Sequence, residues 1–174
     1  MIIAEPQSGA RLCTAILLIV ACWFWPGCAG EVSTASDEEA IRTVIRQYEG
    51  AVNSADAEGV LALYADNAIW MPDNVPPVVG KTAIRRRVEG AFREITLAKR
   101  WHVHEVVVSG DWGFARATGG GTVTEKLSGR QIVESHNELF ILHREPAGSW
   151  KIARFIYNSD TPPAQPVAAQ HDPD

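Results

Sequence analysis

The spacing of apolar residues predicts three helices from Ser36 onward, followed by a series of strands. The first helix begins at a capping box in which the side chains of Ser36 and Glu39 can each reach the backbone N–H of the other. Its apolar face, spaced at three and four positions, carries Ile41, Val44, Ile45, Tyr48 and Val52. The polar segment 53–56 ends this helix, and Asp56 or Ser54 can cap the next one.

The next apolar groups predict a short second helix, a strand and a third helix. The second helix carries Val60, Leu61, Leu63 and Tyr64. A strand from Ala68 to Met71 follows, and then the loop 72–77, which is rich in proline. Thr82 is placed to cap the third helix, which has on one face Ile84, Val88, Phe92 and Ile95.

From Trp101 onward the pattern alternates in the way that is typical of strands. The predicted strands are 101–109, 112–124, 131–143 and 150–158, with a turn between each pair. Gly119, Gly120 and Gly121 lie inside the second of these strands with no helix after them, which favours a bulge or a sharp bend over a phosphate loop. This order predicts an α+β domain in which three N-terminal helices pack on a curved antiparallel sheet.

The segments on either side of residues 36–160 have the composition of appendages. An apolar run follows Arg11 and ends near Ala29, which predicts a signal peptide over 1–29. A lipoprotein signal with the lipid on Cys28 and an uncleaved membrane anchor are the alternatives. Residues 30–35 then form a linker, and the proline-dense segment 161–174 is expected to be a disordered tail. We therefore expect an exported protein, periplasmic or extracellular, that meets the membrane only through its signal or lipid anchor.

Charge and cysteine content narrow the chemistry of the domain. With a net charge of −5 and a pI of about 5.5, the chain lacks the basic balance typical of nucleic-acid binding. The basic run 85–87 is interpreted as a solvated helix face, with an anion site as the alternative. All three cysteines precede residue 30, so the domain has no disulfide and no thiolate chemistry. His102 and His104 share a strand face, but two ligands do not predict a metal site, and no cofactor is predicted.

Strand 131–143 provides the candidate site, because one of its faces places three ionisable residues between apolar ends. That face reads Ile132, Glu134, His136, Glu138, Phe140 and Leu142. If it points into a pocket, desolvation raises the pKa of a carboxyl there, and His136 can act as an acid or a base near neutral pH. The alternative is that this face meets solvent or a second copy of the chain.

Three phrases of the sequence carry a resemblance to a known family: NSADAEGVLALYADNAIWMP, VVGKTAI and GSWKIARFIYN. In this order they resemble the NTF2-like superfamily, and within it the SnoaL-like, DUF4440 and ketosteroid-isomerase-like group. The resemblance covers the whole of 36–160. It implies a cone-shaped domain around one deep pocket for a small hydrophobic molecule, and a homodimer paired through the open face of the sheet.

The resemblance also places roles on particular residues. The oxyanion-hole tyrosine of the isomerases falls on Tyr48, and the acid that shares this oxyanion hole falls on Glu138. In the enzyme hypothesis these two residues bind the developing oxyanion, and His136, which the strand pattern places beside Glu138, acts as the acid or base. Their general base falls on Pro72, and Asp73 comes one residue late, so their proton shuttle is not implied. Ligand-binding positions are expected at Trp70, Phe92, Glu134, Phe140, Phe155 and Tyr157. The group includes isomerases, dehydratases, cyclases, epoxide hydrolases and non-catalytic binding or dimerisation modules, so both an enzyme and a binding module follow from it.

Overall fold

The computed structural model describes residues 34–160 of the 174-residue chain. The predicted signal peptide 1–29, the predicted tail 161–174 and most of the predicted linker lie outside these residues. The helices are α1 (Thr34–Asn53), α2 (Ala57–Leu63) and α3 (Lys81–Glu94). The strands are β1 (Tyr64–Met71), β2 (Val78–Val79), β3 (Ile95–Ser109), β4 (Trp112–Glu125), β5 (Gln131–Arg144) and β6 (Trp150–Ser159).

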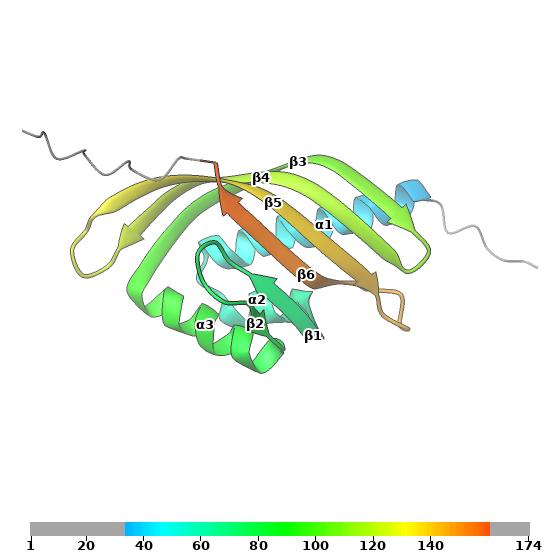
Figure 1. Ribbon diagram of the computed structural model, residues 1–174, viewed down its shortest axis with the longest axis horizontal. Coiled ribbons are helices and arrows are strands. Elements are labelled where there is room, and N and C mark those ends of the chain that lie inside the picture. The colour runs from blue at the N-terminus through cyan, green and yellow to red at the C-terminus, as the bar shows by residue number, and fades with distance from the viewer. Residues whose placement is uncertain (1–33, 161–174) are drawn as a thin grey trace, which may run out of the picture. The chain divides into compact units, whose positions relative to one another are not determined.

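The strands form one curved sheet in the order β2-β1-β6-β5-β4-β3, and the helices lie on its inner side (Figure 1). The predicted α+β arrangement is confirmed, with one correction to the sheet. It is mixed rather than antiparallel, because β1 pairs in parallel with β6. A parallel pair needs a long connection, and α3 with β3 to β5 supplies it. Alternation along a strand shows which residues share a face but not the direction of the neighbouring strand.

Two strands begin earlier than predicted, because each continues directly from the helix before it. β1 begins at Tyr64 rather than Ala68, and β3 begins at Ile95 rather than Trp101. Tyr64 and Ile95 are both extended and serve as the C-caps of α2 and α3, so no loop separates helix from strand. The exposed pair Asp66–Asn67, which resembles a turn in sequence, lies within β1.

The helix caps agree with the sequence at only one of three positions. Asp56 caps α2 as predicted by accepting a hydrogen bond from the backbone N–H of Gly59, at 2.9 Å. The capping box at Ser36 is wrong, because α1 already includes Thr34. Gly80, with a φ of 83°, is the N-cap of α3 in place of Thr82.

An acidic residue near the start of α1 has a structural role that its sequence position does not reveal. Asp37 is only 5% exposed and accepts hydrogen bonds from the guanidinium of Arg144 and from the indole N–H of Trp150. The hydrogen bond from Arg144 is the main reason why the pKa of Asp37 is lowered. The Arg144 guanidinium also lies over the Trp150 ring, 4.6 Å from its centroid. This cluster fixes the first turns of α1 to the ends of β5 and β6.

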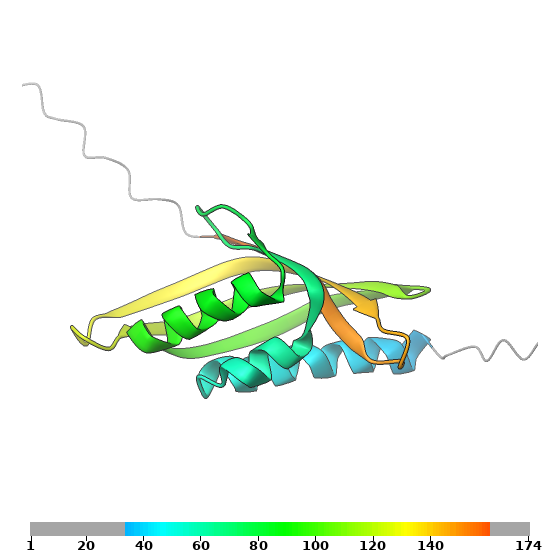
Figure 2. The same cartoon turned by 90° about the horizontal axis from the view of Figure 1, so that it is seen from below.

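The apolar face of α1 packs with α2 against the inner face of the sheet, whose strands supply more than half of the core residues. Seen from below, α3 crosses the same side of the sheet near its curved end (Figure 2). Gly121 lies within this curvature with a φ of 148°, and an added Cβ would come within 2.1 Å of the Ala98 carbonyl oxygen. Gly119, Gly120 and Gly121 keep a regular register with both neighbouring strands, so the glycine run holds no bulge; the irregular register of β3 and β4 lies between Val103 and Glu105.

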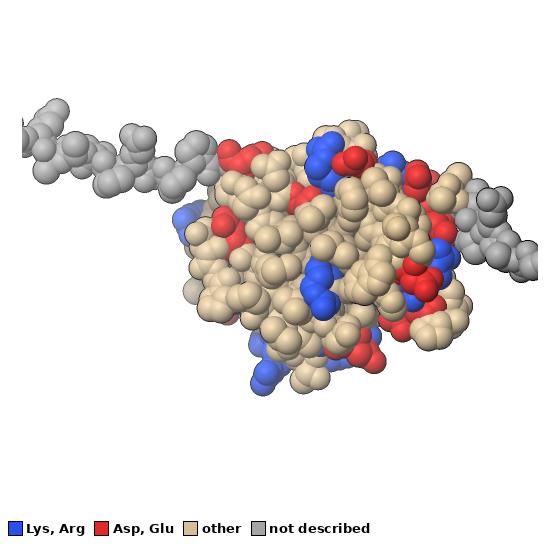
Figure 3. Space-filling view, turned by 45° about the vertical axis from the view of Figure 1, so that its right-hand side comes forward, with Lys and Arg blue, Asp and Glu red and all other residues tan. Residues whose placement is uncertain are grey.

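The distribution of surface charge bears on nucleic-acid binding, and the composition of the helices bears on a membrane-spanning segment. In the view of Figure 3, Lys and Arg side chains lie scattered among acidic ones and do not form a basic face of the kind that binds nucleic acid. Among residues 34–160, no helix is long and apolar enough to cross a membrane.

Candidate ligand pocket and acid–base site

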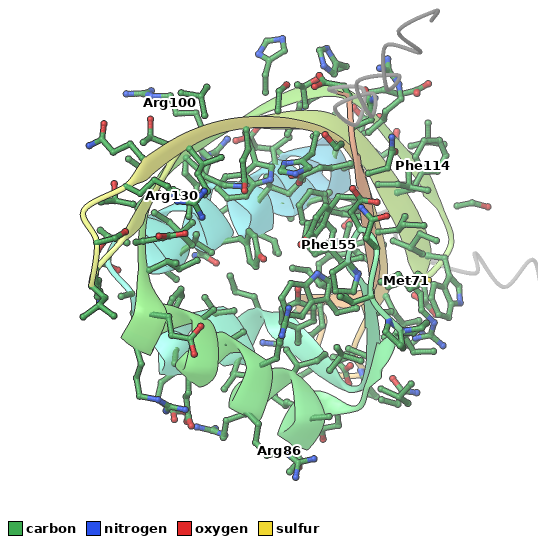
Figure 4. The ribbon with its side chains drawn as sticks, turned by 60° about the vertical axis from the view of Figure 1, so that its left-hand side comes forward. Met71, Arg86, Arg100, Phe114, Arg130 and Phe155 are labelled. Atoms are coloured by element: carbon green, nitrogen blue, oxygen red, sulfur yellow. The ribbon has the colours of Figure 1, made fainter. Side chains whose placement is uncertain are left out.

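A cavity of about 220 Å³ lies between α1, α3 and the inner face of the sheet. Its wall is mostly apolar and includes Val52, Val60, Val88, Phe92, Leu97 and Val123. Figure 4 shows Phe155 pointing into this interior, whereas Arg86 and Arg100 point away from it. Because pockets for drug-sized molecules are about 300–1,000 Å³, this cavity suits a smaller ligand.

Eight of the nine site residues predicted from the sequence line this one cavity. They are Tyr48, Trp70, Phe92, Glu134, His136, Glu138, Phe155 and Tyr157. The ninth, Phe140, does not line it. Its side chain is fully buried behind the wall and stacks on Phe155, with ring centroids 4.2 Å apart. Phe140 therefore supports the lining residue Phe155 from behind and does not contact a ligand. At this position the inner face of β5 is covered by the core and no longer by the cavity.

Glu138 is the most perturbed carboxyl of the cavity. Its residue is 5% exposed, and burial raises its pKa from 4.5 to about 7. Two effects lower the pKa of Glu138 and so limit this rise. The indole N–H of Trp101 donates a hydrogen bond to the carboxylate, and the positive charge of Lys99 favours its ionised form. A carboxyl with this pKa exchanges a proton readily at neutral pH.

The contact between Trp101 and Glu138 depends on the glycine that lies between them. Trp101 is on β3 and Glu138 is on β5, and Gly119 on the intervening β4 is the direct register partner of Trp101. A Cβ at Gly119 would lie 2.1 Å from Oε1 of Glu138 and 2.8 Å from Nε1 of Trp101. The missing side chain therefore provides the space in which the indole and the carboxyl meet.

Tyr48 reaches the cavity from α1 within a cluster of aromatic rings. Its ring makes edge contacts with those of Trp101 and Phe155, at centroid distances of 5.4 and 5.7 Å. Burial, and then the charge of Glu138, raise the pKa of Tyr48, and its hydroxyl shares a hydrogen bond with that of Tyr64. Because its pKa is raised, the Tyr48 hydroxyl keeps its proton and can serve as a hydrogen-bond donor.

His136 lines the cavity between an aromatic ring and a salt bridge. It is 8% exposed and lies edge-on to Tyr157, with ring centroids 4.9 Å apart. Burial and the positive charge of Lys99 lower the pKa of His136, so its imidazole is neutral at pH 7. Its Nδ1 is buried and has no hydrogen-bond partner within residues 34–160. Lys99 itself forms a salt bridge with Glu134, at 2.8 Å.

Four polar residues of this region are absent from the set predicted by sequence. They are Tyr64, Arg87, Lys99 and Trp101. Lys99 precedes Trp101, in a segment where the sequence pattern predicts no strand. Trp101 begins the predicted strand, but its position in the sequence does not reveal the carboxyl that it meets on β5. Counted from Ile95, the alternation of β3 places both on its inner face with Leu97. Tyr64 was assigned to the apolar face of α2, although it is the first residue of β1.

The remaining sequence candidates lie outside the cavity. Pro72 is buried, and Asp73 accepts a hydrogen bond from the backbone N–H of Ser159 at 3.3 Å. His102 and His104 are exposed on the outer face of the sheet, where His104 contacts the hydroxyl of Thr118. No group of three or more potential metal ligands is found within the part of the chain that the structure describes.

Comparison with known protein families identifies the family of this chain. The model of the SnoaL-like domain matches residues 44–149, which is more than half of the chain. The protein belongs to the SnoaL-like family. This confirms the resemblance seen in the sequence and places the domain in the NTF2-like superfamily.

Solved structures agree with this assignment. A ketosteroid isomerase-like protein from Erwinia carotovora atroseptica is 31% identical, covers 72% of this chain and 98% of its own, and has a TM-score of 0.68. A conserved protein from Planctomyces limnophilus is 22% identical over 72% of this chain and 98% of its own, with a TM-score of 0.64. An NTF2-like protein with a cystatin-like fold from Novosphingobium aromaticivorans is 21% identical over 75% of this chain and 86% of its own, with a TM-score of 0.59.

The family assignment leaves the reaction of this SnoaL-like protein open. No curated protein matches its sequence. In contrast, 454 solved chains share the fold, and a fold this widespread does not select one chemistry. The function therefore has to be argued from the cavity and its residues.

Proposed function

We propose that this SnoaL-like protein binds a small, largely apolar molecule in its cavity and that Glu138 transfers a proton to or from it. One observation carries the proposal: a carboxyl with a pKa of about 7 is buried in a cavity whose wall is mostly apolar. General acid–base catalysis is most effective when the pKa of the catalytic group is near the working pH. Family membership is consistent with this, because ketosteroid isomerase-like proteins share the fold.

In this proposal the other polar residues stabilise the reacting molecule. The Tyr48 hydroxyl donates a hydrogen bond to oxygen as negative charge develops there, in the manner of an oxyanion hole. His136 is the second candidate for the proton carrier: its lowered pKa leaves the imidazole in the neutral form that can accept a proton, but also makes it a weaker base. Trp101 holds the carboxyl of Glu138 in place through its indole N–H. The arrangement supports isomerisation or dehydration of a molecule with an enolisable or hydroxylated carbon, and hydrolysis is the remaining possibility of this class.

Deuterium exchange into a simple ketone tests the proposal without knowledge of the natural substrate. The purified protein is incubated with acetophenone in deuterium oxide, and loss of the methyl proton signal is followed by NMR. We expect Glu138→Gln to slow the protein-catalysed exchange by about a hundredfold or more, the usual contribution of a general base. Glu105→Gln, at a half-exposed carboxylate away from the cavity, serves as the control and leaves the rate unchanged. Equal rates for the wild-type protein and the Glu138→Gln variant would exclude proton transfer by this residue and leave the ligand-binding module.

A second function is favoured by a separate surface, the outer face of the sheet. On this face Val107, Phe114 and Ile141 are direct register partners across β3, β4 and β5, and Leu139 on β5 pairs with Ile156 on β6. These five residues form an apolar stripe, which is flanked by Arg116 and Arg154, the other register partners of Leu139 and Ile141. Val107 is 41% exposed and Ile156 is 42% exposed. Because contiguous apolar side chains on a surface mark interaction sites, we propose that two copies of the chain pair through this stripe.

The dimer proposal is tested by the mass of the purified protein in solution. Multi-angle light scattering is expected to give twice the chain mass for the wild-type protein. Ile156→Lys places a charge within the stripe, at its β6 end, and is expected to give a monomer. Lys151→Glu, on the same strand but outside the stripe, is the matched control and remains a dimer. A wild-type protein with the mass of one chain would refute the proposal.

A further inference from the structure

The three arginines at positions 85–87 have different surroundings, although they are adjacent in sequence. Arg85 pairs with Glu58 on α2 and lies 3.5 Å from Glu89 on its own helix. Arg86 is exposed and points away from the cavity (Figure 4). Arg87 also has an exposed side chain, but it forms part of the wall of the cavity. Successive residues of a helix differ by about 100° in direction, so only one of the three reaches the cavity.

The charge of Arg87 is not balanced by a neighbouring acid. Within residues 34–160 it has no carboxylate at salt-bridge distance. The other cation of the wall, Lys99, is paired with Glu134 at 2.8 Å. Lys99 therefore already has a carboxylate partner, whereas the charge of Arg87 remains available to a molecule in the cavity.

Arg87 also acts on the polar end of an aromatic wall residue. Tyr157 lines the same cavity, and burial raises its pKa to about 12. Arg87 lines the same cavity, and its positive charge acts in the opposite direction on this pKa. An anionic group at this place would meet both a cation and a hydroxyl that keeps its proton at neutral pH.

We infer that the ligand of the cavity is a small carboxylic acid whose carboxylate pairs with Arg87 while its apolar body contacts the wall. This inference rests on the proposed binding function and adds the chemical class of the ligand. A carboxylate is favoured over a neutral polar group because the planar guanidinium can donate two parallel hydrogen bonds to it. The apolar wall, formed in part by Val88 and Phe92 on the same helix, then selects against small hydrophilic anions.

Two probes of nearly equal shape separate the effect of charge from that of apolar contact. Phenylacetate and phenylacetamide differ at one end, where the carboxylate is replaced by a neutral amide. Affinities of both for the purified full-length protein are measured by calorimetry at pH 7 and low ionic strength. We expect phenylacetate to bind about fivefold more tightly, the upper range for a partly exposed ion pair. The preference is expected to fall at high salt, because the pair is screened.

Variants of two adjacent arginines provide the matched comparison. Arg87→Gln removes the cation of the cavity and is expected to abolish the preference for phenylacetate while leaving the affinity for phenylacetamide unchanged. Arg86→Gln removes the same charge from the same helix but outside the cavity, and is expected to keep the preference.

The outcomes distinguish failure of this inference from failure of the proposed function. Equal binding of both probes by the wild-type protein overturns the inference and leaves an apolar binding cavity. The same loss of preference in Arg86→Gln as in Arg87→Gln also overturns it, because the attraction would then come from α3 as a whole. If neither probe binds, the proposed binding function fails and the inference fails with it.

Discussion

The raised pKa of Glu138 predicts that this residue makes the protein less stable as the pH rises. An unfolded chain has an ordinary glutamate at position 138, with a pKa of 4.5, whereas the folded protein raises it to about 7. Between these values the folded state binds more protons than the unfolded state. The free energy of unfolding therefore falls as the pH increases through this range, and the loss is complete above the folded pKa.

The size of the effect follows from the two pKa values. One pKa unit corresponds to 1.36 kcal/mol, so a rise from 4.5 to about 7 amounts to about 3 kcal/mol. Glu138→Gln removes the ionisation but keeps the shape, and its side-chain carbonyl can still accept the hydrogen bond from Trp101. The variant should match the wild-type protein near pH 4, below the unfolded pKa, and exceed its stability by about 3 kcal/mol near pH 8.

Urea unfolding followed by tryptophan fluorescence measures this difference. Wild-type protein and variant are compared at a series of pH values and at one protein concentration, because association also affects stability. Glu105→Gln, which changes a half-exposed carboxylate, is the control and should show no difference that grows with pH. If the wild-type and Glu138→Gln curves stay equally far apart from pH 5 to pH 8, Glu138 ionises as an ordinary surface glutamate and the argument for its role is wrong.

Two further predictions concern the glycine beside the site and the start of α1. Gly119→Ala should separate the Trp101 indole from the Glu138 carboxyl and so raise the pKa of Glu138 above 7, as measured by a carbon-13 NMR titration. Gly120→Ala is the control: its Cβ would lie 3.4 Å from the nearest atom, and it should leave this pKa unchanged. Asp37→Asn should lower the free energy of urea unfolding by about 2 kcal/mol, because it weakens two buried hydrogen bonds, one of them charge-assisted. Asp111→Asn, at a carboxylate 72% exposed, should cost much less, and equal losses for the two variants would contradict a special role for the buried cluster.

The sequence was a good guide to the elements and to the inner face of β5. The helical spacing of α1 correctly placed Tyr48 on its buried side, and the alternation of β5 correctly grouped Glu134, His136 and Glu138. These patterns succeed because helix and strand periods directly determine which residues share a face. The same rule failed for Phe140, which shares that face but lies beyond the end of the cavity, because the period of a strand contains no information on the depth of a pocket.

Errors in the site arose where a partner lies on another element. Lys99 lowers the pKa of both His136 and Glu138, yet it belongs to the part of β3 before Trp101, where the sequence pattern predicts no strand. Arg87 was included in a solvated run, because three adjacent charges give no indication which of them reaches a cavity. Both residues became recognisable only once the helix and strand directions were known.

The arrangement around Glu138 shows why such sites are difficult to predict from a list of chemically active side chains. Its carboxyl and the Trp101 indole come from strands that are not neighbours, and they meet over β4 only because Gly119 has no side chain. The residue that permits the contact therefore has no functional group of its own. A prediction that searches for acids, bases and nucleophiles will pass over it, whereas a search for small residues between two inward-facing polar side chains on flanking strands would identify it. Gly119→Ala tests this reasoning directly, since it changes the pKa of Glu138 without altering any ionisable group.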